Sequence, residues 1–132
     1  MKVLVDTSVW SLALRRGSGS EVGVVRELSS LIGDGRVTMV GPIRQEILSG
    51  IREEEQFKEL EARLAAFPDI GLEPQDHVTA ARFFNLCRRK GVQGSNTDFL
   101  ICAVAVRHRL AILTTDRDFA QYAKYLPIVL HK

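Results

Sequence analysis

Short runs of β-branched and aliphatic residues alternate with helix-like stretches along the whole chain. The runs expected to form strands cover residues 2–5, 37–40, 70–72, 111–113 and 128–129. Strands that alternate with helices assemble into a parallel sheet whose crossover helices cover both faces. The sequence therefore predicts an α/β fold, a three-layer α/β/α sandwich with a central parallel sheet of about five strands.

Apolar residues recur with a helical period between these runs. The helices are expected at residues 9–14, 21–32, 42–51, 57–67, 76–90 and 99–106. Pro42 stands where proline best opens a helix, and Gly91 is expected to stop one. The segment 99–106 is apolar on every side, which is typical of a helix buried all round. Trp10 and Leu14 lie one turn apart, and we expect both to be partly exposed in the monomer.

The length and hydropathy of the chain are those of one domain. At 132 residues it is long enough to bury its own core, so residues 1–132 are expected to form a single domain. No apolar run approaches the roughly 20 residues that cross a bilayer. Asp6 cuts the first apolar run too early for a signal peptide, so we expect a cytoplasmic protein without a membrane partner. The Gly17-Ser18-Gly19-Ser20 segment is expected to be a loop.

The two cysteines, Cys87 and Cys102, lie among apolar neighbours in helix-like segments. In a chain without an export signal, such cysteines are more often buried and reduced than joined in a disulfide. Neither has a His or Cys at zinc-ligand spacing. We therefore expect two buried thiols and no zinc site.

Two aspartates follow the ends of predicted strands. Asp6 comes directly after the first strand, and Asp116 follows Leu113-Thr114-Thr115 at the end of another. In parallel sheets the ligand site lies beyond the carboxyl ends of the strands, where the strand order reverses. Both positions also have a structural explanation. Asp6 could cap the first helix, and Asp116-Arg-Asp-Phe could form a turn and an N-cap, with Asp118 as the cap.

Two further acids lie near helix starts. Glu46 borders the apolar stripe of Ile43 and Ile47, although a glutamate there is usually only solvated. Ser95 and Asp98 match a capping box. The helix that Asp98 opens is apolar all round, so its carboxylate would enter the edge of the interior, where charge is costly unless paired or bound to metal.

Four carboxylates at one edge of the sheet would repel one another unless a cation neutralised them. We therefore expect Asp6, Glu46, Asp98 and Asp116 to form a metal site. Oxygen ligands without His or Cys favour Mg²⁺ or Mn²⁺ over zinc. A water retained by Mg²⁺ could then attack a phosphodiester. With these four acids neutralised, the rest of the surface would be distinctly positive and would suit a polyanion.

Four segments carry a resemblance to a known family. They are Val-Leu-Val-Asp6-Thr7-Ser8, Gln45-Glu46-Ile-Leu-Ser-Gly, Asn96-Thr97-Asp98 before Phe-Leu-Ile-Cys, and Leu113-Thr114-Thr115-Asp116-Arg-Asp-Phe. In order and spacing they resemble the motifs of the PIN-domain family over nearly the whole chain. The length and the Asp-Thr-Ser start resemble most the VapC-type toxins of prokaryotic toxin–antitoxin pairs.

The resemblance implies a metal-dependent endoribonuclease that cleaves RNA with Mg²⁺ or Mn²⁺ held by the four acids. It implies that Thr114 is the family's hydroxyl near the metal, although a β-branched strand end would explain this residue as well. It also implies a homodimer and a cognate VapB-type antitoxin that wraps the toxin and blocks its site. Whether Asp118 contributes beside Asp116 stays open.

Several basic residues could follow an RNA backbone. They are Arg15, Arg16, Arg88, Arg89, Lys90, Arg107, Arg109 and Arg117. We expect Arg117 to lie near the substrate. The others are as well explained as solvated helix ends, and residues 88–90 also complement a helix C-terminal dipole.

Other proteins also place aspartates past their strands. A phosphatase of that kind needs a second acid two residues after the first, where this chain has Ser8, and a receiver domain needs an acidic pair at the end of its first strand. Neither fits. The alternative that stays is a catalytically silent PIN-like RNA-binding or interaction domain, against which the complete set of four acids argues.

Overall fold

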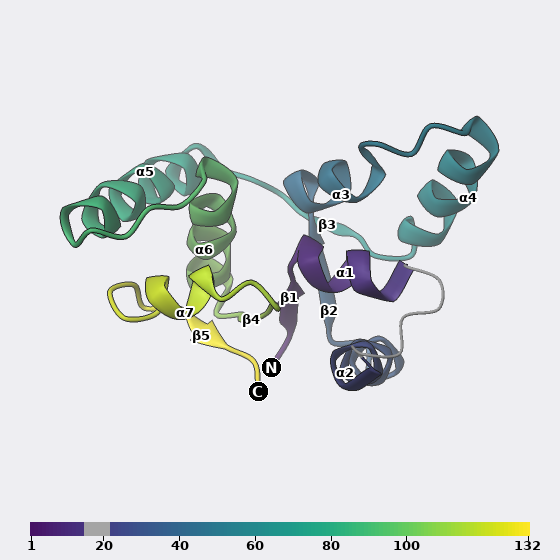
Figure 1. Ribbon diagram of the computed structural model, residues 1–132, viewed down its shortest axis with the longest axis horizontal. Helices are drawn as coiled ribbons and strands as arrows, with labels where there is room; N and C mark the ends of the chain where they lie inside the picture. Colours follow the sequence, from purple (N-terminus) through teal and green to yellow (C-terminus); the bar gives the residue numbers. More distant parts are fainter. Residues whose placement is uncertain (15–21) are drawn as a thin grey trace.

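The centre of the computed structural model is a sheet of five strands in the order β3-β2-β1-β4-β5 (Figure 1). The structure describes residues 1–14 and 22–132, so the expectations for Arg15, Arg16 and the loop at residues 17–20 lie outside the described residues. The strands are β1 (Val3–Val5), β2 (Val37–Val40), β3 (Asp69–Ile70), β4 (Ala111–Leu113) and β5 (Val129–Leu130). All neighbouring strands pair in parallel. The parallel α/β fold expected from the alternating pattern is confirmed.

Helices cover the sheet in two layers. Those of the described residues are α1 (Thr7–Leu14), α2 (Val22–Gly33), α3 (Gly41–Leu48), α4 (Glu54–Leu64), α5 (Pro74–Arg89), α6 (Asn96–His108) and α7 (Asp118–Tyr122). Figure 1 shows α1 to α4 on one side of the strands and α5 to α7 on the other. Crossovers are right-handed, so the helices on one side lead to strands added in one direction from β1, and those on the other side lead to strands added in the opposite direction. The strand order therefore reverses between β1 and β4. A ligand site is expected beyond the carboxyl ends of these two strands.

The core is built from the two central strands and α6. Every residue of β1 and β4 is buried. In α6, Phe99 and the run from Ile101 to Ala105 are buried as well. The segment expected to be buried all round is therefore buried except at Leu100 and Val106, which are partly exposed. None of the described helices has the length and apolar character needed to cross a membrane.

The two cysteines are free thiols inside this core. Cys87 and Cys102 are buried and unpaired, as expected. Burial raises the pKa of both thiols. A thiol that stays protonated is a poor nucleophile and a poor metal ligand, so both residues serve packing.

Trp10 is buried, and the expectation that it is partly exposed is wrong. Its side chain is 4% exposed and packs edge to face on Phe67, with the ring centroids 5.3 Å apart. Leu14, one turn later, stays partly exposed as expected. Phe67 lies just before β3, so the cover over Trp10 comes from a segment that the helical period of α1 alone could not reveal.

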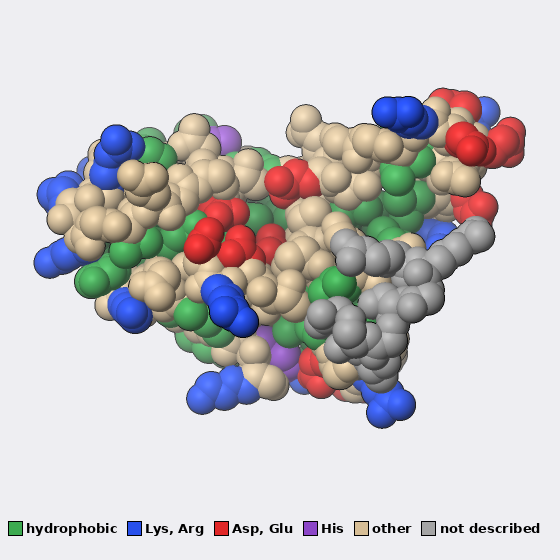
Figure 2. Space-filling view, viewed as in Figure 1, with side chains coloured by type: hydrophobic (Ala, Val, Ile, Leu, Met, Phe, Trp, Pro, Cys, Tyr) green, Lys and Arg blue, Asp and Glu red, His purple; other side chains and the backbone are tan. Residues whose placement is uncertain are grey.

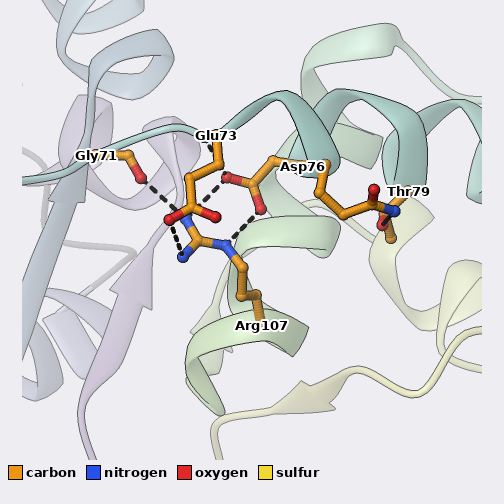
Figure 3. A network of polar contacts seen from close by, with 6 residues as sticks. Gly71, Glu73, Asp76, Thr79 and Arg107 are labelled. Atoms are coloured by element: carbon orange, nitrogen blue, oxygen red, sulfur yellow. Dashed lines mark hydrogen bonds and ion pairs between the residues drawn. The ribbon is translucent and has the colours of Figure 1, made fainter.

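Arg107 on α6 fixes the start of α5 (Figure 3). Its Nε and Nη2 donate to the two carboxylate oxygens of Asp76, at 2.6 and 2.8 Å, and Nη2 also donates to the carbonyl of Gly71 at 2.9 Å. The backbone N–H of Glu73 donates a further hydrogen bond to Asp76 Oδ2, at 2.9 Å. A guanidinium engaged in this way holds the fold together, so the structure gives no support to Arg107 as an RNA ligand.

Candidate active site

Asp6 lies at the carboxyl end of β1, where the strand order reverses. Its side chain is only 6% exposed, and its Oδ2 accepts hydroxyl hydrogen bonds from Ser8 and Thr114, both at 2.9 Å. The hydrogen bonds of the described residues include none from a helix N–H to this carboxylate. Asp6 therefore begins α1 through its backbone carbonyl, which accepts the N–H of Val9 at 3.1 Å, and its side chain is left for another role.

Thr114 and Ser8 join the end of β4 to the start of α1. Besides donating to Asp6, Thr114 Oγ1 accepts the N–H of Asp116 at 3.0 Å, and Ser8 Oγ accepts the N–H of Thr115 at 3.1 Å. The two hydroxyl oxygens lie 3.3 Å apart. The structure thus places Thr114 in the candidate site, where the family resemblance put it. Ser8 was not expected there, and its only signal in the sequence is its position two residues after Asp6.

Asp116 makes the side-chain bond that opens α7. Its Oδ1 accepts the N–H of Asp118 at 2.9 Å, and Arg117 is the N-cap residue of the helix. The hypothesis that Asp118 caps this turn is therefore wrong. Arg117 and Asp118 are both exposed beside the candidate site.

Asp98 lies in the first turn of α6. Half of the expected capping box forms, because Ser95 Oγ accepts the N–H of Asp98 at 3.0 Å. The Asp98 carboxylate turns instead to Tyr122, whose hydroxyl donates to Oδ2 at 2.7 Å. Burial raises the pKa of Asp98, the Tyr122 hydrogen bond opposes this effect, and the charges of Asp6 and Asp116 raise the pKa further. These three carboxylates are therefore close enough to act on one another.

Glu46 is tied to the same region through α1. It is exposed on α3, and its Oε1 accepts the hydroxyl of Thr7 at 2.8 Å. Thr7 directly follows Asp6, so this bond holds Glu46 beside the end of β1. The structure thus brings the fourth predicted acid to the site from the opposite side of the strand reversal.

The donor set suits a hard cation, but it is not a closed metal cage. Figure 2 shows Asp and Glu side chains gathered near the middle of one face. Within residues 1–14 and 22–132, no three His, Cys, Asp or Glu side chains lie close enough together to hold a metal ion as they stand. Carboxylates repel one another when no cation lies between them. Mg²⁺ needs only one or two carboxylates and keeps several waters, so an open, oxygen-only arrangement fits its chemistry.

The chain is similar to a set of known proteins over nearly its whole length. The PIN domain family model matches residues 3–125. Two curated relatives are Ribonuclease VapC11 of Mycobacterium tuberculosis and VapC ribonuclease Mb1587 of Mycobacterium bovis. Each is 35% identical over 125 residues, which are 92% of this chain and 92% of the relative.

Solved structures share the fold at lower identity. FitAcB from Neisseria gonorrhoeae superposes with a TM-score of 0.74 at 22% identity and covers 98% of this chain and 96% of its own. VapBC2 from Rickettsia felis, bound to a fragment of promoter DNA, gives a TM-score of 0.77 at 18% identity, with 99% and 98% covered. At these identities the likeness concerns the fold alone.

Proposed function

Because the chain belongs to the PIN domain family, we propose that it is a divalent-metal-dependent endoribonuclease and the toxin of a type II, VapBC-type toxin–antitoxin pair. Two relatives at 35% identity are named VapC ribonucleases, which supports this activity. The observation that carries the proposal is the nearly buried Asp6 carboxylate, held by two hydroxyls at the strand reversal. A buried charge is costly, and such charges are typical of sites that bind a cation or perform chemistry.

Mg²⁺, or Mn²⁺ in its place, would be held by Asp6, Asp98, Asp116 and Glu46. The chemistry supplied by the bound cation is stabilisation of the negative charge that develops on the phosphoryl oxygens. Thr114 and Ser8 keep the Asp6 carboxylate in one orientation, since both hydroxyls donate to the same oxygen. That leaves the other oxygen of Asp6 for the cation.

RNA is the proposed substrate, and Arg117 the proposed contact to its backbone. Arg117 is exposed next to Asp116, and its guanidinium makes no hydrogen bond or ion pair with another residue that the structure describes, so it can reach a phosphate. Arg88, Arg89, Lys90 and Arg109 are exposed too, but they lie at the ends of α5 and α6. We therefore assign substrate contact to Arg117 alone.

The same family membership supports a proposal for the biological setting. We propose that residues 1–132 act as one nuclease domain in the cytoplasm, as a homodimer, under the control of a cognate VapB-type antitoxin. An antitoxin that covers the acids would prevent access of RNA. Copurification of the chain with a co-expressed neighbouring small protein, followed by loss of cleavage, would test the pairing.

Replacing Asp6 by asparagine is expected to remove RNA cleavage without unfolding the protein. An amide oxygen can still accept the hydroxyls of Ser8 and Thr114, but the charge that attracts a cation is gone. We expect cleavage to fall on the order of 100- to 1000-fold, with an unchanged or slightly higher melting temperature. The assay uses a circular RNA, which only an endonuclease can open, with Mg²⁺, with Mn²⁺ and with EDTA.

Asp34→Asn is the matched control, because Asp34 is exposed in the turn after α2. It should cleave like the wild type. Cleavage by the wild type in EDTA, or by Asp6→Asn at the wild-type rate, would contradict the proposal. RNA binding without cleavage under every condition would favour the catalytically silent alternative.

A further inference from the structure

Tyr122, the last residue of α7, reaches from the core to the candidate site. Its side chain is fully buried, yet its hydroxyl lies 2.7 Å from Asp98 Oδ2 and donates to it. The two residues are 24 positions apart in the chain and belong to different helices. A buried hydroxyl needs a hydrogen-bond partner. The partner of the Tyr122 hydroxyl is the Asp98 carboxylate, which the proposed function assigns to the cation.

Aromatic packing fixes the position of the Tyr122 ring. Phe99 lies on one side, with its ring centroid 4.8 Å away, and Phe119 on another, at 5.2 Å and nearly edge to face. Phe99 directly follows Asp98 in α6, so the same turn of helix carries the carboxylate and part of the packing around the tyrosine. The packed core therefore fixes the position of the Tyr122 hydroxyl beside Asp98.

Gly94 makes room for this hydroxyl. A Cβ atom at position 94 would lie 2.3 Å from Tyr122 Oη, 2.7 Å from its Cζ and 2.9 Å from the Phe99 ring. The φ angle of Gly94 is not in the left-handed region, so its conformation does not call for glycine. The missing side chain is needed for space, next to Ser95, which caps α6.

From this geometry we propose that Tyr122 is a positioning residue for Asp98, and that Gly94 is the space it requires. The hydroxyl holds Oδ2, so the Asp98 carboxylate is kept in one orientation towards the cation. The inference rests on the proposed function. Partners that orient metal ligands from behind commonly contribute 10- to 100-fold to metal affinity or activity.

Tyr122→Phe removes the hydroxyl and keeps the ring. Because Asp98 then loses its orienting donor, we expect Mn²⁺ affinity in calorimetric titration to fall about 10- to 100-fold. The kcat of RNA cleavage should fall with it at subsaturating Mn²⁺, whereas the KM for RNA should change little. Tyr125→Phe is the matched control, because the chain has only these two tyrosines and Tyr125 is exposed beyond α7. It should behave like the wild type in every measurement.

Gly94→Ala tests the same arrangement from the other side. The added methyl group must displace the tyrosine hydroxyl, so this variant should also lose Mn²⁺ affinity. Combining it with Tyr122→Phe removes the closest clash, at 2.3 Å. The approaches to Cζ at 2.7 Å and to the Phe99 ring at 2.9 Å remain. The double variant should therefore lose less Mn²⁺ affinity than the sum of the two single losses, because there is no hydroxyl left to displace.

The possible outcomes separate the inference from the function beneath it. A wild-type chain that neither binds Mn²⁺ nor cleaves RNA would overturn the proposed function, and this inference with it. A wild-type chain that does both, beside a Tyr122→Phe variant with unchanged Mn²⁺ affinity and kcat, would overturn the inference alone. A melting temperature in EDTA that falls while Mn²⁺ affinity and kcat stay unchanged would reduce the contact to a structural one.

Discussion

Asp98→Asn is expected to abolish most Mn²⁺ binding and RNA cleavage while making the metal-free protein more stable at neutral pH. Asparagine keeps the oxygen that accepts the Tyr122 hydroxyl, and the Ser95 cap uses the backbone N–H of residue 98, which the change leaves alone. What disappears is a negative charge close to Asp6 and Asp116. We expect cleavage to fall on the order of 100- to 1000-fold, as when one preorganised charge or donor is removed from an active site.

The gain in stability follows from the direction of the Asp98 pKa shift. Burial raises the pKa of this carboxyl in the folded chain, so its charged form is less favourable there than in the unfolded chain. The stability that the neutral form provides is fully present below the ordinary pKa of about 4 and is lost as the pH rises through the higher folded value. Asparagine stays neutral throughout, so its advantage should be seen at pH 7 in EDTA and should vanish below about pH 4.

Stability is measured by melting curves across this pH range, and Mn²⁺ affinity by titration of the same samples, with Asp34→Asn as control. A cap-only role for Asp98 predicts unchanged Mn²⁺ binding and cleavage. Unchanged Mn²⁺ binding together with a lowered melting temperature would place Asp98 among the caps and remove it from the metal site.

The fold could be predicted because each of its elements has a local signal. The β-branched runs before Asp6 and Asp116 are β1 and β4, and the all-apolar segment is α6. Gly91 ends α5 as expected, with a φ of 79° that other residues rarely adopt. The outer strands differ by one or two residues from expectation, because β3 and β5 are two residues long and are defined by pairing with a neighbour. The helix α7 was expected only as a turn, since its five residues are too few for a clear period.

Of the candidate site, the sequence predicted the acids and, through the family resemblance, Thr114. Carboxylates that follow strands stand out in a sequence, because the carboxyl ends of parallel strands meet at one edge. The partners of these acids do not stand out. Ser8, Thr7 and Tyr122 are ordinary helix residues until the fold places their hydroxyls against Asp6, Glu46 and Asp98. The burial of Trp10 was not predicted for the same reason, because Phe67, which packs on it, is distant in the sequence.

Asp76→Asn is expected to give the largest loss of stability outside the site. Asp76 is 2% exposed and accepts two bonds from the Arg107 guanidinium and one from the Glu73 N–H. The amide that replaces it has one acceptor oxygen and no charge, so at least one of the paired bonds to Arg107 is lost. Hydrogen bonds to charged groups contribute about 1.5–3 kcal/mol each, and we expect the free energy of unfolding at pH 7 to fall by about 2 kcal/mol.

The pH dependence of this loss identifies its cause. The Arg107 hydrogen bonds are the main reason that the pKa of Asp76 lies below its ordinary value. The stabilisation is therefore fully present above the unfolded pKa of about 4 and is lost as the pH falls through the lower folded value. Urea unfolding of Asp76→Asn at pH 7, 5 and near 2.5 should show a constant deficit in the free energy of unfolding at the first two values and a smaller one at the third. Asp34→Asn should show little change throughout.

RNA cleavage by folded Asp76→Asn should equal that of the wild type, because the Arg107 network lies at the start of α5 and includes none of the four proposed metal ligands. A deficit that grew towards low pH would mean that Asp76 stabilises α5 by some route other than its pair with Arg107.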